Sequence, residues 1–225
     1  MTVLMINICD KLLSSLALVI LSPLLLIICL ILTFTGEGEI FYKQPRLGKN
    51  AKVFHILKFA TMLRDSSKIG SGELTLIDDY RVLPVGKFLR KWKLNELPQL
   101  INVLVGDMSL VGPRPHTLSY ANCFHDNDLI RIYSVKPGLS GLGSLIFRDE
   151  ETILSKVPNP IEFDEKFIMP YKGKIESWFV EKYSFRLYAL IIMLTIFEVA
   201  RPGKLQISSF FDHLPKPPEN LEKLL

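Results

Sequence analysis

The sequence predicts an α+β, mostly helical domain seated on a membrane, and two observations favour this class. Residues 12–32 carry no charged side chain. As a helix, at about 1.5 Å per residue, they reach roughly 30 Å, the thickness of a bilayer core. Hydrophobic residues make up 48% of the 225 residues and mean hydropathy is +0.26, values typical of a membrane-attached protein.

Length and charge limit the organisation and the partners. The chain is long enough for one domain with an appendage, which we divide into a membrane helix (1–35), a main domain that would carry any activity (36–204) and a mobile C-terminal tail rich in proline (205–225). The net charge of +4 is spread along the chain without a nucleic-acid motif, so we expect no nucleic-acid partner. Three cysteines without paired spacing indicate a reducing compartment, with no disulfide framework and no zinc site.

The apolar N-terminal segment contains Ser22-Pro23 at its centre. Proline lacks an amide hydrogen and its ring clashes with the preceding turn, so the pair predicts a break that would bend the helix. A bent helix can enter and leave the bilayer by the same face, whereas a straight one would span it. Basic residues after the segment, Lys43, Arg46, Lys49 and Lys52, predict that the rest of the chain lies on the cytoplasmic face.

Two short segments follow near the predicted membrane surface. Residues 39–48 carry Gln44 and Arg46, which can hydrogen-bond phosphate or sugar oxygens, although a basic loop here can equally contact lipid headgroups. Residues 53–62 resemble a strand, and residues 64–80, polar and rich in glycine, are predicted to form an exposed loop.

The most informative stretch runs from residue 91 to 115. Apolar residues at helical spacing predict a short helix that begins near Asn95, its candidate N-cap, and ends at Gly106. Two prolines then flank Arg114 and fix its backbone, so that its guanidinium can fork onto a phosphate. With Glu96 in the first turn, the stretch indicates phosphate chemistry. Taken singly, each part has a purely structural alternative: Asn95 as an N-cap, Glu96 as a carboxylate that offsets the helix dipole, and the turn around Arg114 as a solvated turn.

The remaining residues predict mainly helices. We expect an amphipathic helix over residues 117–134, a Gly-rich turn near residues 137–141, a polar connection over 156–174 and one long helix over 175–200. The apolar part of that last helix is too short to span a bilayer, so it is expected to lie in the core or at the membrane interface.

From Glu96 to Pro115 the chain resembles the bacterial sugar transferases that are monotopic polyprenol-phosphate phosphoglycosyl transferases, whose signature is close to Asp-Glu-Leu-Pro-Gln-Leu-x-Asn-Val-Leu-x-Gly-Asp-Met-Ser-Leu-Val-Gly-Pro-Arg-Pro. The resemblance extends over residues 8–200. It implies transfer of a sugar-1-phosphate from a UDP-sugar to undecaprenyl phosphate, release of UMP and a need for Mg²⁺, with Glu96 as the metal ligand. It also implies a re-entrant N-terminal helix broken at Ser22-Pro23, and a place on the cytoplasmic face of a bacterial inner membrane.

One departure from the signature falls on the catalytic pair. The family has Asp-Glu, with the Asp as nucleophile, where this chain has Asn95-Glu96. A neutral amide cannot attack phosphorus as a carboxylate does. Glu96 could attack instead, or the lipid phosphate could attack directly. A third route uses another carboxylate, for which Asp107, Asp149 and Glu150 are candidates.

The resemblance assigns supporting roles to cationic and polar side chains. We expect a catalytic group of Glu96, Asn95 and Arg114, and phosphate or substrate contacts from Arg90, Arg114, Gln44, Arg46, Lys58 and Arg148. Lys91 and Lys93 are expected to be solvated, and Ala60 replaces an arginine that is usual in the family.

The predicted function is therefore a phosphoglycosyl transferase of polysaccharide or glycoconjugate synthesis. Its predicted partners are a UDP-sugar, polyprenol phosphate, membrane lipid and later glycosyltransferases of the same pathway. The competing hypothesis is a non-catalytic membrane homologue that binds nucleotide sugar or lipid phosphate, because Asn95 replaces the family's Asp.

Overall fold

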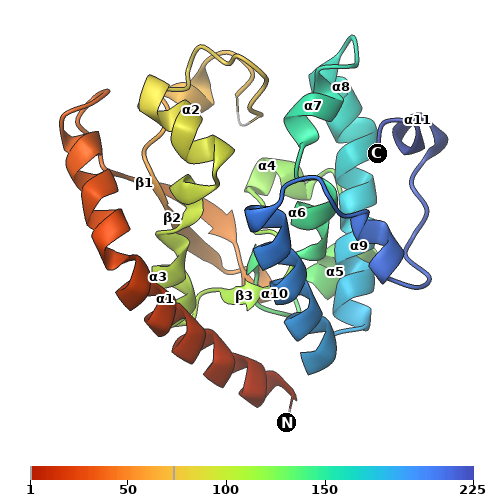
Figure 1. Cartoon of the computed structure of the whole chain (residues 1–225). Coiled ribbons are helices and arrows are strands. Elements are labelled where there is room, and N and C mark those ends of the chain that lie inside the picture. Colours follow the sequence, from red (N-terminus) through yellow and green to blue (C-terminus); the bar gives the residue numbers. More distant parts are fainter. Residues whose placement is uncertain (1, 73) are drawn as a thin grey trace.

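The computed structural model describes residues 2–72 and 74–225 and is mostly helical, with two small sheets (Figure 1). The strands are β1 (Phe41–Leu47), β2 (Val53–Phe59), β3 (Ser109–Val111) and β4 (Gly138–Ser140). The helices are α1 (Thr2–Thr33), α2 (Pro84–Lys91), α3 (Gln99–Val105), α4 (Leu118–Ala121), α5 (Asp126–Ile132), α6 (Leu142–Ile146), α7 (Glu150–Leu154), α8 (Pro160–Phe163), α9 (Met169–Glu181), α10 (Phe185–Ala200) and α11 (Glu219–Glu222).

Helix α1 is long and apolar enough to cross a membrane. It stays helical through Pro23, so the predicted break at Ser22-Pro23 is not confirmed. The missing amide of Pro23 would leave the carbonyl of Val19 without a donor, and the Ser22 hydroxyl donates to that carbonyl at 2.8 Å. The serine thus compensates for the proline, and Figure 1 shows the ribbon changing direction without interruption.

The two sheets join segments that are distant in sequence. β1 and β2 form an antiparallel hairpin in which Phe41 faces Phe59 and Leu47 faces Val53. β3 and β4 pair in parallel, although 26 residues separate Val111 from Gly138. Asn102 of α3 binds the backbone of β2, accepting from Leu57 N at 2.9 Å and donating to the carbonyl of His55 at 2.8 Å. The hairpin is therefore fixed to α3.

Helix boundaries differ from the predictions at three places. The segment 117–134 divides into α4 and α5, and α9 begins inside the predicted connection of residues 156–174. The predicted helix of residues 175–200 is two helices, because the Ser184 hydroxyl caps α10 by accepting from Leu187 N. α10 buries Leu187, Tyr188, Ile191 and Leu194 and exposes Met193, Ile196 and Val199, so it has an apolar face on both sides.

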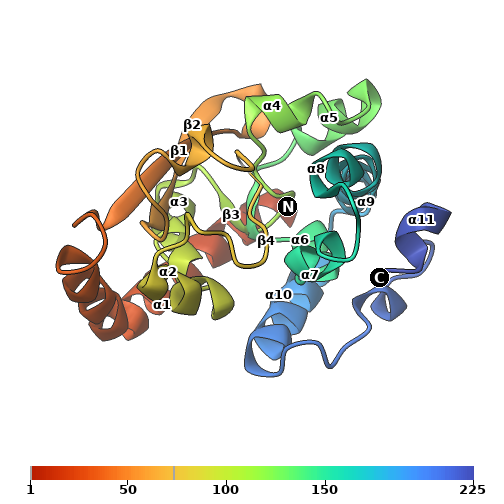
Figure 2. The same ribbon diagram turned by 90° about the horizontal axis from the view of Figure 1, so that it is seen from above.

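The main core lies between α6, α7, α9 and α10, and it includes part of the predicted tail. Ile207, Phe211 and Leu221 are buried there, and Tyr171 of α9 donates to the carbonyl of Pro215 at 2.8 Å. The C-terminal segment, interpreted from its prolines as a separate mobile tail, is thus packed on the domain. Viewed from above, it runs along the outer side of α9 (Figure 2).

Candidate active site

Three elements bring the central charged residues together. Glu96 ends a single turn, Leu94–Glu96, ahead of α3, Lys58 lies on β2, and Arg114 follows β3. One carboxylate oxygen, Glu96 Oε1, lies 3.3 Å from Lys58 Nζ and 3.1 Å from Arg114 Nη2. The predicted meeting of a carboxylate and the proline-flanked arginine is therefore observed, with a lysine as a third member.

The site is strongly cationic. Burial would raise the pKa of Glu96, but the charges of Arg114, Lys58 and Lys93 hold it well below its ordinary value. Burial lowers the pKa of Lys58 to about 8 against the opposing effect of Glu96, and Arg114 and Arg46 lower it further. Three cationic groups thus act on one carboxylate and Arg46 acts on Lys58 beside them, which suits a ligand with several negative charges.

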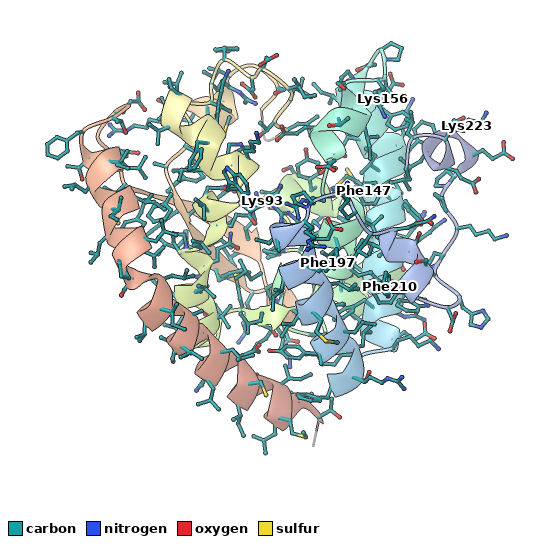
Figure 3. All side chains as sticks on the ribbon, in the orientation of Figure 1. Lys93, Phe147, Lys156, Phe197, Phe210 and Lys223 are labelled. Carbon is teal, nitrogen blue, oxygen red and sulfur yellow. The ribbon has the colours of Figure 1, made fainter. Side chains whose placement is uncertain are left out.

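Lys93 completes this cluster from the segment between α2 and α3 (Figure 3). Its residue surface is partly exposed, but burial lowers the pKa of its amine and its charge acts on Glu96. Its φ of 57° is left-handed backbone, uncommon for a residue with a side chain. That turn directs the chain from α2 into the Leu94–Glu96 turn.

Gln44 and Arg46 of β1 lie beside the Arg114 loop. The Gln44 side-chain oxygen accepts from Arg46 at 3.2 and 2.6 Å, and Arg46 Nη1 donates to the carbonyl of Pro115 at 3.4 Å. A shallow hollow, partly open to solvent, is lined by Arg46, Ile56, Lys58, Gln99, Arg114, Pro115 and Gly138.

Asn95 is buried beside Glu96, with 6% of its surface exposed, and its Oδ1 has no hydrogen-bond partner. The prediction that it caps the following helix is wrong. α3 begins at Gln99 after Pro98, which cannot act as a side-chain cap. Gly106 ends α3 in a left-handed conformation with φ of 95°, as predicted.

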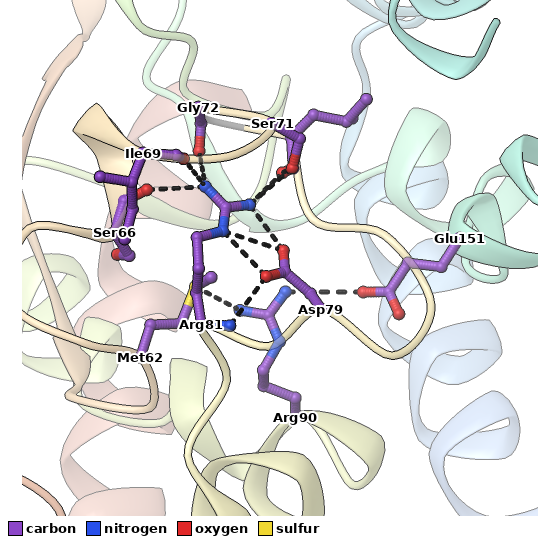
Figure 4. Close-up of polar contacts among 10 residues, drawn as sticks. Met62, Ser66, Ile69, Ser71, Gly72, Asp79, Arg81, Arg90 and Glu151 are labelled. Carbon is purple, nitrogen blue, oxygen red and sulfur yellow. Dashed lines mark hydrogen bonds and ion pairs between the residues drawn. The ribbon is translucent and has the colours of Figure 1, made fainter.

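Two other arginines that were predicted to contact phosphate, Arg90 and Arg148, form ion pairs with carboxylates. Arg90 Nη2 lies 3.5 Å from Glu151 and Nη1 lies 3.8 Å from the sulfur of Met62 (Figure 4). Arg148 pairs with Glu198 of α10 at 3.7 Å. Neither contacts Glu96, although the charge of Arg148 reaches Lys93.

The three candidate replacement carboxylates lie in different surroundings. Asp107 is exposed beyond the C-terminal end of α3, opposite the end that carries Glu96. Asp149 is exposed ahead of α7. Glu150 pairs with Lys172 of α9, and its charge acts on Arg114. Of the three, Glu150 alone has a described electrostatic link to the cationic cluster.

Glu176 of α9 binds the backbone of the Arg114 loop. The sequence analysis did not identify this residue. It is 1% exposed, and its Oε1 accepts from Arg114 N at 3.3 Å. Burial raises its pKa to about 7 against the opposing effect of that hydrogen bond and of the charges of Lys172 and Arg114. A Cβ on Gly143 would lie 2.6 Å from the same carboxylate oxygen, so Glu176 fits only beneath a glycine. The available sequence signal for Glu176 was its position between the apolar residues Ile175 and Phe179.

A second missed residue, Arg81, organises the loop after β2. It is 1% exposed and its guanidinium donates to Asp79, to Ser71 and to the carbonyls of residues 66, 69, 72 and 74 (Figure 4). The predicted exposed loop is therefore wound around a buried cation. Leu83 N then donates to the carbonyl of Thr61 at 3.0 Å, which closes the loop.

Known proteins resemble this chain over most of its length. The family model described as "Bacterial sugar transferase" matches residues 1–202. The UDP-glucose:undecaprenyl-phosphate glucose-1-phosphate transferase of Klebsiella pneumoniae is 37% identical over 196 residues, which cover 84% of this chain and 38% of that protein. The protein of the same name from Escherichia coli (strain K12) is 34% identical over 194 residues, 84% of this chain and 39% of that protein.

A shorter relative matches over more of its own length. The exopolysaccharide production protein ExoY of Sinorhizobium fredii (strain NBRC 101917 / NGR234) is 35% identical over 162 residues, which cover 66% of this chain and 71% of that protein. The chain thus spans about two-fifths of the two glucose-1-phosphate transferases and most of the exopolysaccharide protein.

Proposed function

Because the chain belongs to the bacterial sugar transferase family, we propose that it transfers a sugar-1-phosphate from a UDP-sugar to a polyprenol phosphate and releases UMP. The observation that carries the proposal is the cationic cluster of Lys58, Arg114 and Lys93 around Glu96, in a domain that packs on an apolar helix. The names of the relatives support a UDP-sugar and undecaprenyl phosphate as substrates. The lipid-linked product would be consumed by later glycosyltransferases of a polysaccharide pathway.

The cations bind and orient the diphosphate. Lys58 and Arg114 share one oxygen of Glu96, so a phosphate oxygen can take up the donors that Glu96 leaves free. Arg46 and Gln44 lie at the edge of the same hollow, and Arg90 lies farther out on α2. Donors held in place before the reaction stabilise the charge that develops on the departing UMP.

We propose that magnesium acts at this site as a companion of the substrate. Glu96 Oε1 is already paired with two cations, and among the described residues no group of three His, Cys, Asp or Glu gathers to hold a metal. Mg²⁺ is commonly held by one or two carboxylates together with substrate phosphates and water. Glu96 would supply the protein ligand, and the metal would lower the charge that opposes attack on phosphorus.

For the chemical step we favour direct attack by the lipid phosphate. Glu96 is held by Lys58 and Arg114, Glu150 is paired with Lys172, and Asp107 and Asp149 are exposed outside the cluster. In the direct route an oxygen of the polyprenol phosphate bonds to the phosphorus that carries the sugar. The bond from that phosphorus to the oxygen shared with the nucleotide breaks, and its electron pair leaves with UMP.

The direct route predicts that labelled UMP exchanges into UDP-sugar only when polyprenol phosphate is present. A covalent route through a protein carboxylate would allow exchange without the lipid and would leave a phosphosugar adduct visible by intact-protein mass spectrometry. Asn95→Asp, which restores the family's carboxylate, should gain lipid-independent exchange. Exchange by the natural protein without lipid would rule out the direct route.

The transferase proposal is tested with the full chain in lipid nanodiscs, with Mg²⁺, polyprenol phosphate and a panel of UDP-sugars. UMP release should occur with at least one sugar, and Arg114→Gln should lower kcat/KM by about 10²–10³-fold, as loss of a pre-positioned charge donor does. Arg131→Gln is the matched control, because Arg131 pairs with Glu181 at 3.2 Å on the exposed surface. The proposal would be contradicted if no UDP-sugar of the panel gave UMP release, or if the two variants lost kcat/KM equally.

A non-catalytic homologue is the second candidate, and the buried amide of Asn95 is the observation that favours it. Such a protein would bind nucleotide sugar or lipid phosphate at the same cations without turnover. If Asn95→Asp alone switches on UMP release, this second function is correct and the transferase reading of the natural chain is wrong.

For location we propose the cytoplasmic face of a bacterial inner membrane, with both ends of α1 on that face. Ile6 near the start of α1 packs in the main core, and Ile28 and Leu32 near its end pack with Phe59 and Leu89. Because both ends of α1 contact the same domain, these contacts support a re-entrant helix rather than one that spans the bilayer. The basic residues that follow α1 support the cytoplasmic side.

A further inference from the structure

A polar stripe on α1 faces the domain. Asn7, Asp10 and Ser14 follow helical spacing, and Asp10 and Ser14 are 2% and 0% exposed. A buried carboxylate is costly unless it accepts hydrogen bonds. Asp10 Oδ1 accepts two, from Leu110 N of β3 at 2.9 Å and from the Tyr188 hydroxyl of α10 at 2.8 Å. Asp10 thus joins the apolar helix to two elements of the domain.

The contact with β3 completes a strand edge. One edge of β3 pairs with β4 through Ser109 and Val111. The amide of Leu110, between them, points the other way, as alternate residues of a strand do, and Asp10 accepts from it. The carboxylate therefore takes the place that a neighbouring strand would have.

The backbone between Leu110 and Arg114 is tightly held. Gly112 N donates to the carbonyl of Ser140 at 3.0 Å, and Gly138 N donates to the carbonyl of Pro113 at 2.8 Å. A Cβ on Gly112 would lie 2.8 Å from Gly138 N, so the two backbones are in close contact. A shift of Leu110 would therefore be passed to Pro113 and to Arg114, the next residue.

We propose that Asp10 is a positioning residue that couples the seating of α1 to the placement of Arg114, so that the site binds its diphosphate fully only when α1 is docked. A second contact acts in the same sense, because Lys136 ahead of β4 donates to Asn7 of α1 at 3.0 Å. The kinetic part of this inference rests on the proposed transferase function.

The test compares Asp10→Leu with Asp10→Asn in the full chain, in nanodiscs of phosphatidylethanolamine and phosphatidylglycerol. Asp10→Leu removes the acceptor and should raise KM for the UDP-sugar about tenfold, roughly the cost of one displaced charged contact. Asp10→Asn keeps an acceptor oxygen and should stay within about twofold of the natural protein. A purely structural role would lower the amount of active protein in Asp10→Leu and leave KM unchanged, and that result would overturn the proposal.

Two further measurements keep the outcome decisive. Ser15→Ala, on the exposed side of α1, is the control and should leave KM unchanged. If Asp10→Leu does not fold, Tyr188→Phe removes one of the two donors and should raise KM by about two- to threefold.

Amide hydrogen exchange separates this inference from the transferase proposal. The Leu110 amide should be protected in the natural protein and in Asp10→Asn, and should exchange faster in Asp10→Leu or Tyr188→Phe. If no UDP-sugar is turned over, the function fails, while Leu110 exchange and the dissociation constant of UMP still decide the coupling. Equal Leu110 protection in all variants would overturn it.

Discussion

At the scale of single residues, Lys58 is the cation of the site whose pKa is brought closest to the neutral range. It is largely buried, with 17% of its side chain exposed, and burial lowers its pKa to about 8 although Glu96 opposes the change. Below that pH the lysine is an ammonium that can bind phosphate. Above it, the site loses one of its positive charges.

This pKa predicts a pH-dependent affinity for the nucleotide sugar. KM of the natural protein should rise as pH passes 8, because the free enzyme loses the Lys58 proton. Lys58→Arg should abolish the rise, since arginine stays charged across this range. Steady-state kinetics from pH 6.5 to 9.5 test it, and a constant KM in the natural protein would show that Lys58 does not bind substrate.

The residues of the site divide into those that the sequence could reveal and those that it could not. Glu96 and Arg114 lie in one short stretch with fixed backbone, so their meeting at 3.1 Å could be predicted. Asp10 and Glu176 contact backbone amides 100 and 62 residues away. Such contacts depend on the packing of α1 and α9, which local sequence does not specify.

At the scale of elements, the loop between β2 and α2 depends on one buried side chain. Arg81 donates to four carbonyl groups of the loop and pairs with Asp79 at 2.6 Å (Figure 4). Its contacts replace the regular hydrogen bonds that a helix or strand would provide. The loop should therefore order and disorder as one unit.

Arg81→Ala should destabilise this unit by about 3–5 kcal/mol, the usual cost of removing one partner of a buried ion pair. We expect faster cleavage by trypsin at the exposed Lys68 and a lower unfolding midpoint. Arg64→Ala is the control, because Arg64 pairs with Glu39 in the same region but is 64% exposed. Similar cleavage rates in the two variants would contradict the role assigned to Arg81.

The boundaries of helices could be predicted where a single residue in the sequence ends the helix. Gly106 ends α3 as expected because its positive φ suits glycine. The division between α9 and α10 was missed, since apolar residues continue on both sides of it and the capping Ser184 was overlooked. The pairing of β3 with β4 was also missed, because three-residue strands carry too little periodicity to detect.

At the scale of the whole molecule, the membrane helix and the domain form one packed unit. α1 contacts β3 and α10 near its start and also contacts α3, and much of its remaining surface is apolar and exposed. The exposed apolar face of α10, with Met193, Ile196 and Val199, adds a second surface suited to lipid. The overall class of a mostly helical protein with one apolar helix could be predicted from the uncharged run of residues 12–32 and from the helical spacing of apolar residues elsewhere.

A topology experiment tests the proposed seating. Thr2→Cys and Thr35→Cys, each in a background with the three natural cysteines replaced by alanine, are exposed to a thiol reagent that cannot cross the bilayer. Both should be labelled in inside-out vesicles and protected in right-side-out vesicles, because both ends of α1 contact the same domain. Labelling from opposite sides would establish a span and contradict the proposal.

The contact between Asp10 and Tyr188 also constrains how the protein is made. The ribosome delivers α1 before α10, and the partner that donates to Asp10 from α10 follows 178 residues later. The newly made helix must therefore wait at the bilayer without this buried partner until α10 is synthesised. We expect a nascent chain halted before α10 to lack the final docking of its membrane helix.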